Sequence, residues 1–134
     1  MSRRVVAAMI AVWPVFGTAA TLGEEDGMVI NPLNGSDFEV VETRSMGAAD
    51  FWCGAGTFVE RRSGLSPRTL IYVKRPRGPS TTAPGRKAVV FSINPGGLDV
   101  TDMGLSLSVT VPGKMLRSVR ARQFCRDAFT RSTK

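Results

Sequence analysis

The two cysteines are the residues of this sequence with the clearest chemical potential. Cys53 lies in the stretch FWCGAGT and Cys125 in ARQFCRD, and the chain has no other cysteine. A Trp-Cys-Gly start is typical of a thioredoxin-type redox site, in which a second cysteine three positions on acts as the resolving thiol. Gly56 stands at that position. We therefore predict a structural disulfide between Cys53 and Cys125, with a thiol-redox protein using Cys53 as the alternative.

The expected surroundings of Cys53 favour the disulfide. The residue follows SMGAAD, about two turns into a predicted helix, where the helix dipole does little to stabilise a thiolate. Two cysteines far apart in an exported chain are best explained by one bridge, because an oxidising compartment converts such thiols to a disulfide. In the chain-entropy model, a bridge closing a loop of this length raises the free energy of unfolding by about 4 kcal/mol.

Other residues that could do catalysis or hold a metal are few. The chain contains no histidine, which excludes a serine-type triad and the commonest zinc ligand. Asp99 and Asp102 give two carboxylates in a turn, fewer than the roughly six to eight oxygen ligands that Ca²⁺ takes. We predict a non-enzymatic protein with no metal and no cofactor.

Basic side chains form the second candidate site. Residues 67–134 carry thirteen Lys and Arg against three acids, whereas residues 21–66 carry eight acids against three arginines. A basic surface attracts anionic lipid, acidic polymer or an acidic protein; the alternative is a solvated face that balances the acidic half. Nucleic acid is not a predicted partner, because the basic stretches lack interleaved aromatic residues for stacking. The candidate anion-binding residues are Lys74, Arg75, Arg77, Arg86, Lys87, Arg117, Arg120, Arg122 and Arg126.

The N-terminus has the order of a secretory signal peptide. Arg3 and Arg4 precede an apolar run from Val5 to Phe16, and small residues follow. The run is shorter than the roughly 20 residues that span a bilayer. We predict a cleaved signal over residues 1–20, a flexible lead-in over 21–27, one domain over 21–134 without a transmembrane segment, and a periplasmic location, with secretion as the alternative.

The elements that must position these residues can be read from local patterns. Asn34-Gly35 predicts a turn between strands at 28–33 and 37–43. Apolar residues at helical spacing predict a helix over 45–62, with Ser45 as its cap and Gly64 just past its end. Gly54 and Gly56 within it indicate close approach to a neighbouring element.

Further strands are predicted at 69–75 and 87–93, with a mobile loop between them. Period-two alternation over 105–111 predicts a strand whose inward residues are Leu105, Leu107, Val109 and Val111. Residues 114–117 could pair back as a short strand. A last helix begins at Ser118 and is predicted to bury one apolar face, formed by Ala121, Phe124, Cys125, Ala128 and Phe129.

Three stretches carry a resemblance. The helix DFWCGAGTFVERRSG, the strand TLIYVKR and the ending ARQFCRD together resemble a group of small exported proteins of photosynthetic-type alphaproteobacteria. The likeness spans most of the chain after the leader. It implies a periplasmic protein and brings no activity with it.

Together these patterns predict one α+β domain. An antiparallel sheet packs on a central helix, and a disulfide ties the C-terminal helix to that central helix. The predicted function is an exported binding or accessory protein whose basic second half meets an anionic envelope component or an acidic protein.

Overall fold

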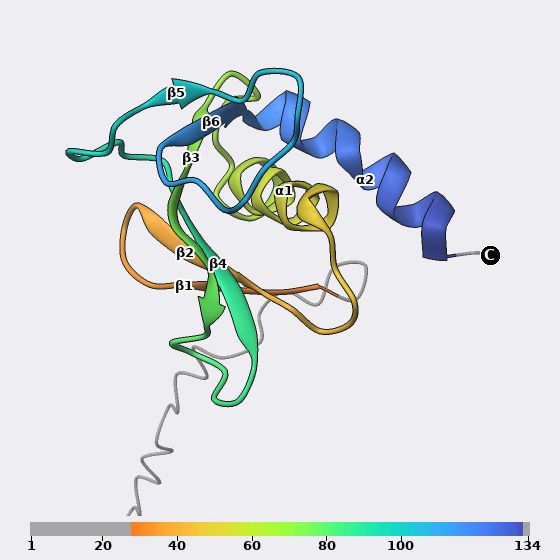
Figure 1. The fold of residues 1–134 in the computed structure, drawn as a ribbon. Helices are drawn as coiled ribbons and strands as arrows, with labels where there is room; N and C mark the ends of the chain where they lie inside the picture. Colours follow the sequence, from red (N-terminus) through yellow and green to blue (C-terminus); the bar gives the residue numbers. More distant parts are fainter. Residues whose placement is uncertain (1–27, 133–134) are drawn as a thin grey trace, which may run out of the picture.

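The structure is a computed structural model that describes residues 28–132, with side chains described as far as Arg126. The predicted signal peptide and lead-in lie outside the described residues, as do the side chains of Ala128 and Phe129. The described chain forms an α+β domain in which α1 lies between a sheet and α2 (Figure 1). The predicted fold class is confirmed.

One mixed sheet contains all the strands of the described residues. Their order across the sheet is β1-β2-β4-β3-β6-β5. All neighbours are antiparallel except β5 and β6, which run parallel. The strands are β1 Val29–Pro32, β2 Asp37–Val41, β3 Leu70–Pro79, β4 Lys87–Ser92, β5 Thr101–Asp102 and β6 Lys114–Arg117.

The predicted hairpin and its turn are present at the start of the sheet. Val29 lies opposite Val41 and Pro32 opposite Phe38. The Asn34 side chain closes the turn, because its Oδ1 accepts hydrogen bonds from the backbone N–H of Ser36 at 2.9 Å and of Asp37 at 2.8 Å. An asparagine side chain that bonds its own backbone in this way favours a turn over a continuing strand.

The central helix begins later than its sequence predicted. Helix α1 spans Ala48–Thr57 and continues as the π-helical segment η1, Phe58–Arg62. Ser45 is not the cap. Asp50 Oδ2 instead accepts a hydrogen bond from the Gly47 backbone N–H at 2.8 Å. A carboxylate in the first turn therefore caps the start of the helix. Gly64 has φ +64° directly after the helix, as predicted.

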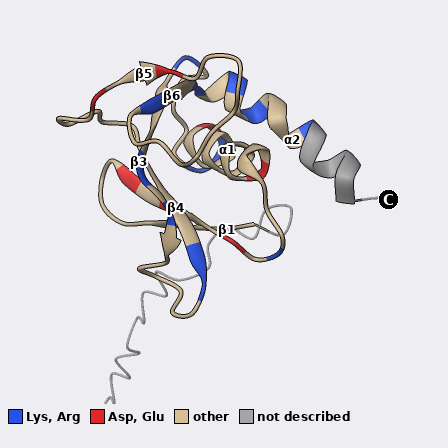
Figure 2. Ribbon diagram, in the orientation of Figure 1, with Lys and Arg blue, Asp and Glu red and all other residues tan. Residues whose placement is uncertain are grey.

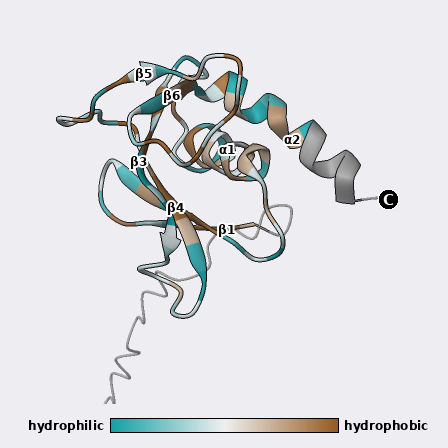
Figure 3. Cartoon of the chain, in the orientation of Figure 1, coloured by the Kyte–Doolittle hydropathy of each residue, from teal (hydrophilic) through white to brown (hydrophobic). Residues whose placement is uncertain are grey.

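The core lies where α1 meets the sheet. Trp52, Phe38 and Phe91 are fully buried. The Trp52 and Phe91 rings meet edge-on with centroids 4.9 Å apart, and Phe38 stacks on Phe58 at 4.3 Å. Figure 3 shows hydrophobic colouring along α1 and along the part of β3 nearest to it. Aromatic contacts of this kind contribute beyond their buried area.

Helix α2, Ser118–Ser132, crosses α1 at very short range. An added Cβ on Gly56 would lie 2.9 Å from the backbone N of Arg122 and 2.9 Å from the backbone O of Ser118. Cys53 and Cys125 form the predicted disulfide across this crossing, with Cα atoms 4.7 Å apart. Glycine is required at position 56 because any larger residue would separate the two helices.

The predicted strand over 105–111 is wrong. This segment forms an irregular loop in which Leu107 and Val109 pack inward whereas Leu105 and Val111 are exposed. Both edges of β6, the strand that follows this segment, are occupied by β3 and β5, so the alternating residues cannot form a hairpin with it. The Trp52 indole N–H donates to the Ser108 carbonyl at 2.9 Å, which anchors the loop over α1 instead. Residues 114–117 do form a strand, β6, but it pairs with β3 and β5.

The loop expected to be mobile over 76–86 is also different. Strand β3 extends to Pro79, and the turn that follows is hydrogen-bonded to the buried Glu39 carboxylate.

None of the helices in the described part of the chain is both long and apolar enough to cross a bilayer.

Candidate anion-binding site

The basic residues of β3 are paired with acids that lie on β2 or directly after it. Lys74 forms an ion pair with Asp37, and Arg77 forms one with Glu42. Arg75 lies 3.9 Å from Glu39 and donates to Thr81 Oγ1 at 3.0 Å. Strand β4 separates β2 from β3, so these pairs bridge across it. Figure 2 shows acidic and basic residues coloured along the ribbon of the sheet. Three of the predicted anion-binding residues, on β3, are therefore already engaged by carboxylates.

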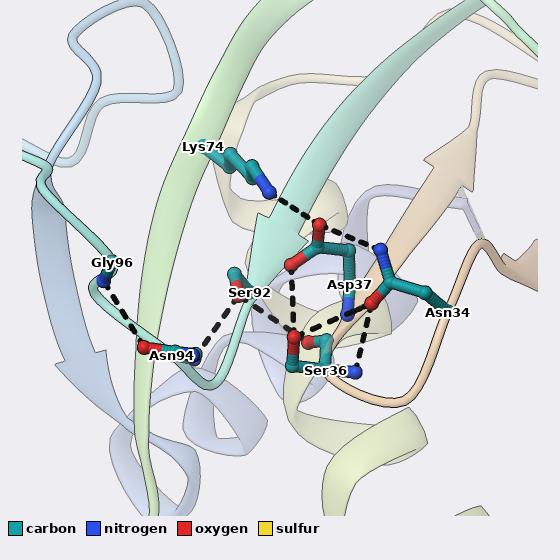
Figure 4. Close-up of polar contacts among 7 residues, drawn as sticks. All are labelled: Asn34, Ser36, Asp37, Lys74, Ser92, Asn94 and Gly96. Carbon is teal, nitrogen blue, oxygen red and sulfur yellow. Dashed lines mark hydrogen bonds and ion pairs between the residues drawn. The ribbon is translucent and has the colours of Figure 1, made fainter.

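Asp37 is the best-connected of these acids (Figure 4). Its carboxylate accepts hydrogen bonds from Lys74 and, at 2.9 Å, from the Asn34 side-chain amide. Burial by itself raises the pKa of Asp37, but the hydrogen bonds and the charge of Lys74 outweigh it and lower the pKa to about 2. The carboxylate is thus held in its charged form.

Glu39 is a fully buried carboxylate inside the domain. The turn after β3 wraps around it: Ser80 Oγ donates at 2.6 Å, Thr81 N–H at 3.1 Å and Thr82 N–H at 2.8 Å. Burial raises the pKa of Glu39, yet these hydrogen bonds lower it below its usual value. Glu39 thus fixes the turn and accounts for part of the acidic charge of the first half.

Acid should weaken this framework in a defined range. Because the folded-state pKa values of Asp37 and Glu39 lie below the ordinary 3.8 and 4.5, their contribution to stability is complete above about pH 5 and is lost as the pH falls toward 2. We expect the free energy of unfolding, measured with urea, to be lower at about pH 3 than at neutral pH. Asp37 alone should account for about 1 kcal/mol of this decrease. Asp37→Asn should flatten the pH dependence; an equally steep dependence in that variant contradicts the assignment.

Arg122 and Arg126 lie on one side of α2. Arg122 Nη1 donates to Glu60 Oε1 at 3.2 Å. Together with Arg61, these two arginines line a cavity of about 600 Å³ beside the disulfide. Arg61 and Arg126 also have interaction partners. This basic surface is therefore balanced at least in part by protein groups.

Arg86 and Lys87 lie at the far end of the sheet, in the turn before β4 and at its first residue. Both are exposed, and neither has a carboxylate partner among residues 28–132. Figure 1 shows that this end of the sheet lies away from α2. Neither side chain lines the cavity beside the disulfide or the one beside Arg117 and Arg120.

Arg117 and Arg120 line a cavity and also lack a carboxylate partner among residues 28–132, whereas Arg86 and Lys87 show only the second of these properties. Neither Arg117 nor Arg120 has a carboxylate partner within the described part of the chain, and both line a cavity of about 400 Å³. We call this cavity the Arg117–Arg120 cleft. Arg117 ends β6 and Arg120 lies in the first turn of α2. The other residues that line the Arg117–Arg120 cleft are Leu70, Asp102, Met103, Gly104, Leu105, Leu107, Met115, Leu116 and Phe124.

The sequence pointed to the two arginines of this cleft but not to its apolar wall. Leu105 and Leu107 were expected to be core residues of a strand, and Met103 and Met115 were not singled out. One signal was available: Arg120 and Phe124 stand four residues apart within the predicted last helix, which places them on one side of it. That spacing could have linked Arg120 to an apolar neighbour, whereas Arg117 ends β6 and is brought to the cleft by the fold.

The disulfide occupies both cysteines, and none is free. Cys53 is 2% exposed, whereas Cys125 is partly exposed and lies 3.7 Å from Thr57 Oγ1. In the described chain, no group of three or more cysteine, aspartate or glutamate side chains is placed to hold a metal ion.

Comparisons with protein-family models, curated proteins and solved structures found no match for this chain. The resemblance to small exported alphaproteobacterial proteins therefore stays a prediction, and the function is argued from the geometry alone.

Proposed function

We propose that this chain is a non-enzymatic binding protein of the periplasm that holds an anionic partner at Arg117 and Arg120. The observation that carries the proposal is the division of the basic residues. Lys74, Arg75 and Arg77 face the carboxylates of Asp37, Glu39 and Glu42, on β2 and directly after it. Arg117 and Arg120 line a cavity without such partners among the described residues.

This division has a physical meaning. An ion pair inside the protein already satisfies its guanidinium or ammonium group, so an incoming anion must compete with a bound carboxylate. Two guanidinium groups beside a cavity have no such competitor and can each donate to an anion through a planar fork of N–H groups. Of the nine predicted anion-binding residues, Arg117 and Arg120 are therefore the two on which we base the proposal.

Export is supported by the disulfide and by the leader sequence. A single bridge in a domain of this size suits an oxidising compartment. The basic N-terminal residues and the apolar run that follows are typical of a secretory signal. Secretion to the exterior is the alternative location.

Binding to a set of anionic probes tests the proposal. The set comprises phosphatidylglycerol vesicles, polyglutamate and sodium decanoate, measured by titration calorimetry at low and high salt. We expect at least one probe to bind, and to bind more weakly as salt screens the charges. Arg117→Gln with Arg120→Gln should weaken that binding at least about tenfold, because a hydrogen bond to a charged group contributes about 1.5 kcal/mol or more.

The matched control is Arg86→Gln with Lys87→Gln, which makes the same change in net charge at the other end of the sheet. It should leave the affinity within about twofold, since charges more than a Debye length apart are largely screened. Equal losses in the two double variants would show a general charge effect and overturn the proposed site. Absence of binding to every probe would overturn the proposed function.

The thiol-redox alternative is checked separately. Because the structure pairs Cys53 with Cys125, we expect no alkylation when protein taken directly from the cell envelope is treated with a thiol reagent under denaturing conditions. Mass spectrometry counts the added groups. A protein that carries one or two alkyl groups would favour the reactive-thiol function instead.

A further inference from the structure

The wall of the Arg117–Arg120 cleft is largely apolar. Leucine, methionine and phenylalanine side chains from the sheet, the 103–113 loop and α2 supply it. A volume of about 400 Å³ lies within the range of small-molecule sites, which join mostly apolar walls to a few polar groups. The cleft therefore offers a place for hydrocarbon as well as a place for charge.

The charged groups of the cleft suit a single negative charge. Arg117 and Arg120 are opposed by the one carboxylate of the lining, Asp102, which leaves a net charge of +1. Lys114 lies close by, because its Nζ donates to the Asp102 carbonyl oxygen at 3.1 Å. A polyanion would bring further negative charge toward Asp102 and be repelled by it. A monovalent head group can contact the guanidinium groups without that cost.

Leu105 makes the apolar part of the cleft accessible. It is the most exposed large hydrophobic side chain of the described residues, and it lines the cleft. The preceding Gly104 has φ +69°, a conformation that turns the chain at this point and that other residues rarely adopt. An apolar side chain held in water at the edge of an apolar cavity gains free energy when a hydrocarbon chain covers it.

We propose that the Arg117–Arg120 cleft binds one molecule of a single-chain anionic amphiphile of the fatty-acid type, with its carboxylate at the two arginines and its alkyl chain along the apolar wall. This inference rests on the proposed function and specifies its ligand. The two parts of the ligand match the two parts of the cleft. A bilayer surface or a second copy of the chain could contact the same side chains, and each gives a different experimental result.

A series of straight-chain carboxylates tests the inference. Hexanoate, octanoate and decanoate are titrated into the protein below their micelle concentrations and at one ionic strength. Each buried methylene contributes about 0.8 kcal/mol, so Kd should fall about fourfold per methylene and about fifteenfold per step of the series. Decanol, with the same chain and no charge, should bind at least about tenfold more weakly than decanoate.

Two variants separate the contribution of the ligand's alkyl chain to the affinity from that of its carboxylate charge. Leu105→Ser should reduce the gain in affinity per methylene while leaving hexanoate binding nearly unchanged. Its side chain is fully exposed, so the variant should fold normally. Arg117→Gln with Arg120→Gln should weaken every member of the series by a similar factor. Val111→Ser, at another exposed apolar residue of the same loop that does not line the cleft, is the matched control and should change neither property.

The outcomes distinguish this inference from the proposed function. Affinity that depends on the two arginines but not on chain length would overturn the amphiphile and leave an anion site. Binding to phosphatidylglycerol vesicles that decanoate does not displace would show a bilayer surface instead and overturn the inference. Concentration-dependent dimerisation in sedimentation experiments, abolished by Leu105→Ser, would assign the cleft to a second copy and overturn it as well. Failure of all anionic probes would overturn both proposals.

Discussion

The double variant Cys53→Ala, Cys125→Ala should be less stable to unfolding by about 4 kcal/mol than the oxidised protein. The bridge joins residues 72 apart in sequence. In the chain-entropy model, closing a loop of that length lowers the entropy of the unfolded chain and so raises the free energy of unfolding by about 4 kcal/mol. A loss of this size is a large fraction of the 5–15 kcal/mol, roughly, that keeps a domain folded. Urea unfolding followed by tryptophan fluorescence measures it.

The reduced wild-type protein is the control for this experiment. It keeps both sulfur atoms and lacks only the bond between them, so it separates the cross-link from the packing of Cys53, which is a buried core residue of α1. Reductant should lower the stability of the wild type by a similar amount and leave the double variant unchanged. A double variant within about 1 kcal/mol of the oxidised protein would contradict a structural role for the bridge.

Gly56→Ala should destabilise the domain by about 2 kcal/mol, although alanine is the better helix former by about 1 kcal/mol. The added Cβ would lie 2.9 Å from two backbone atoms of α2, the Arg122 nitrogen and the Ser118 oxygen. Backbone atoms cannot rotate away as a side-chain end can, so the two helices must move apart and lose contact. Urea unfolding at neutral pH measures the change.

Gly35→Ala provides the matched control, because it makes the same chemical change where nothing lies within 4 Å of the added Cβ. It should alter stability by less than about 0.5 kcal/mol. If Gly56→Ala were as stable as the wild type or more so, the close crossing of α1 and α2 would be wrong, and with it the geometry that brings the two cysteines together.

Several parts of the fold were readable from local sequence. Asn34 closes a turn through its own side chain, and Gly64 ends the central helix in the left-handed region. Such features depend on a few neighbouring residues, whose conformational preferences act before any tertiary contact forms. The start of α1 was missed because Asp50, and not Ser45, takes the capping role.

The predicted strand over 105–111 was wrong for a different reason. Period-two alternation indicates residues that fit one face of a sheet, but it does not say whether a partner edge is available. In the fold, β5 takes the outer edge of β6, and the alternating segment becomes the loop that forms part of the Arg117–Arg120 cleft. Edge occupancy is set by the whole chain, so no local pattern could have shown it.

The disulfide, the α+β class and the sign of the charge in each half could be predicted without the fold. With only two cysteines there is one possible intramolecular pair, and composition alone fixes net charge. Which basic residues form ion pairs within the protein depends on the tertiary structure. Asp37 and Lys74 are 37 positions apart, and Glu42 and Arg77 are 35 apart, so their pairing follows from the order of β2, β4 and β3 in the sheet. Arg117 and Arg120 lie beside an apolar cleft in whose lining Asp102 is the one carboxylate among the described residues, and it is the fold that brings these residues together.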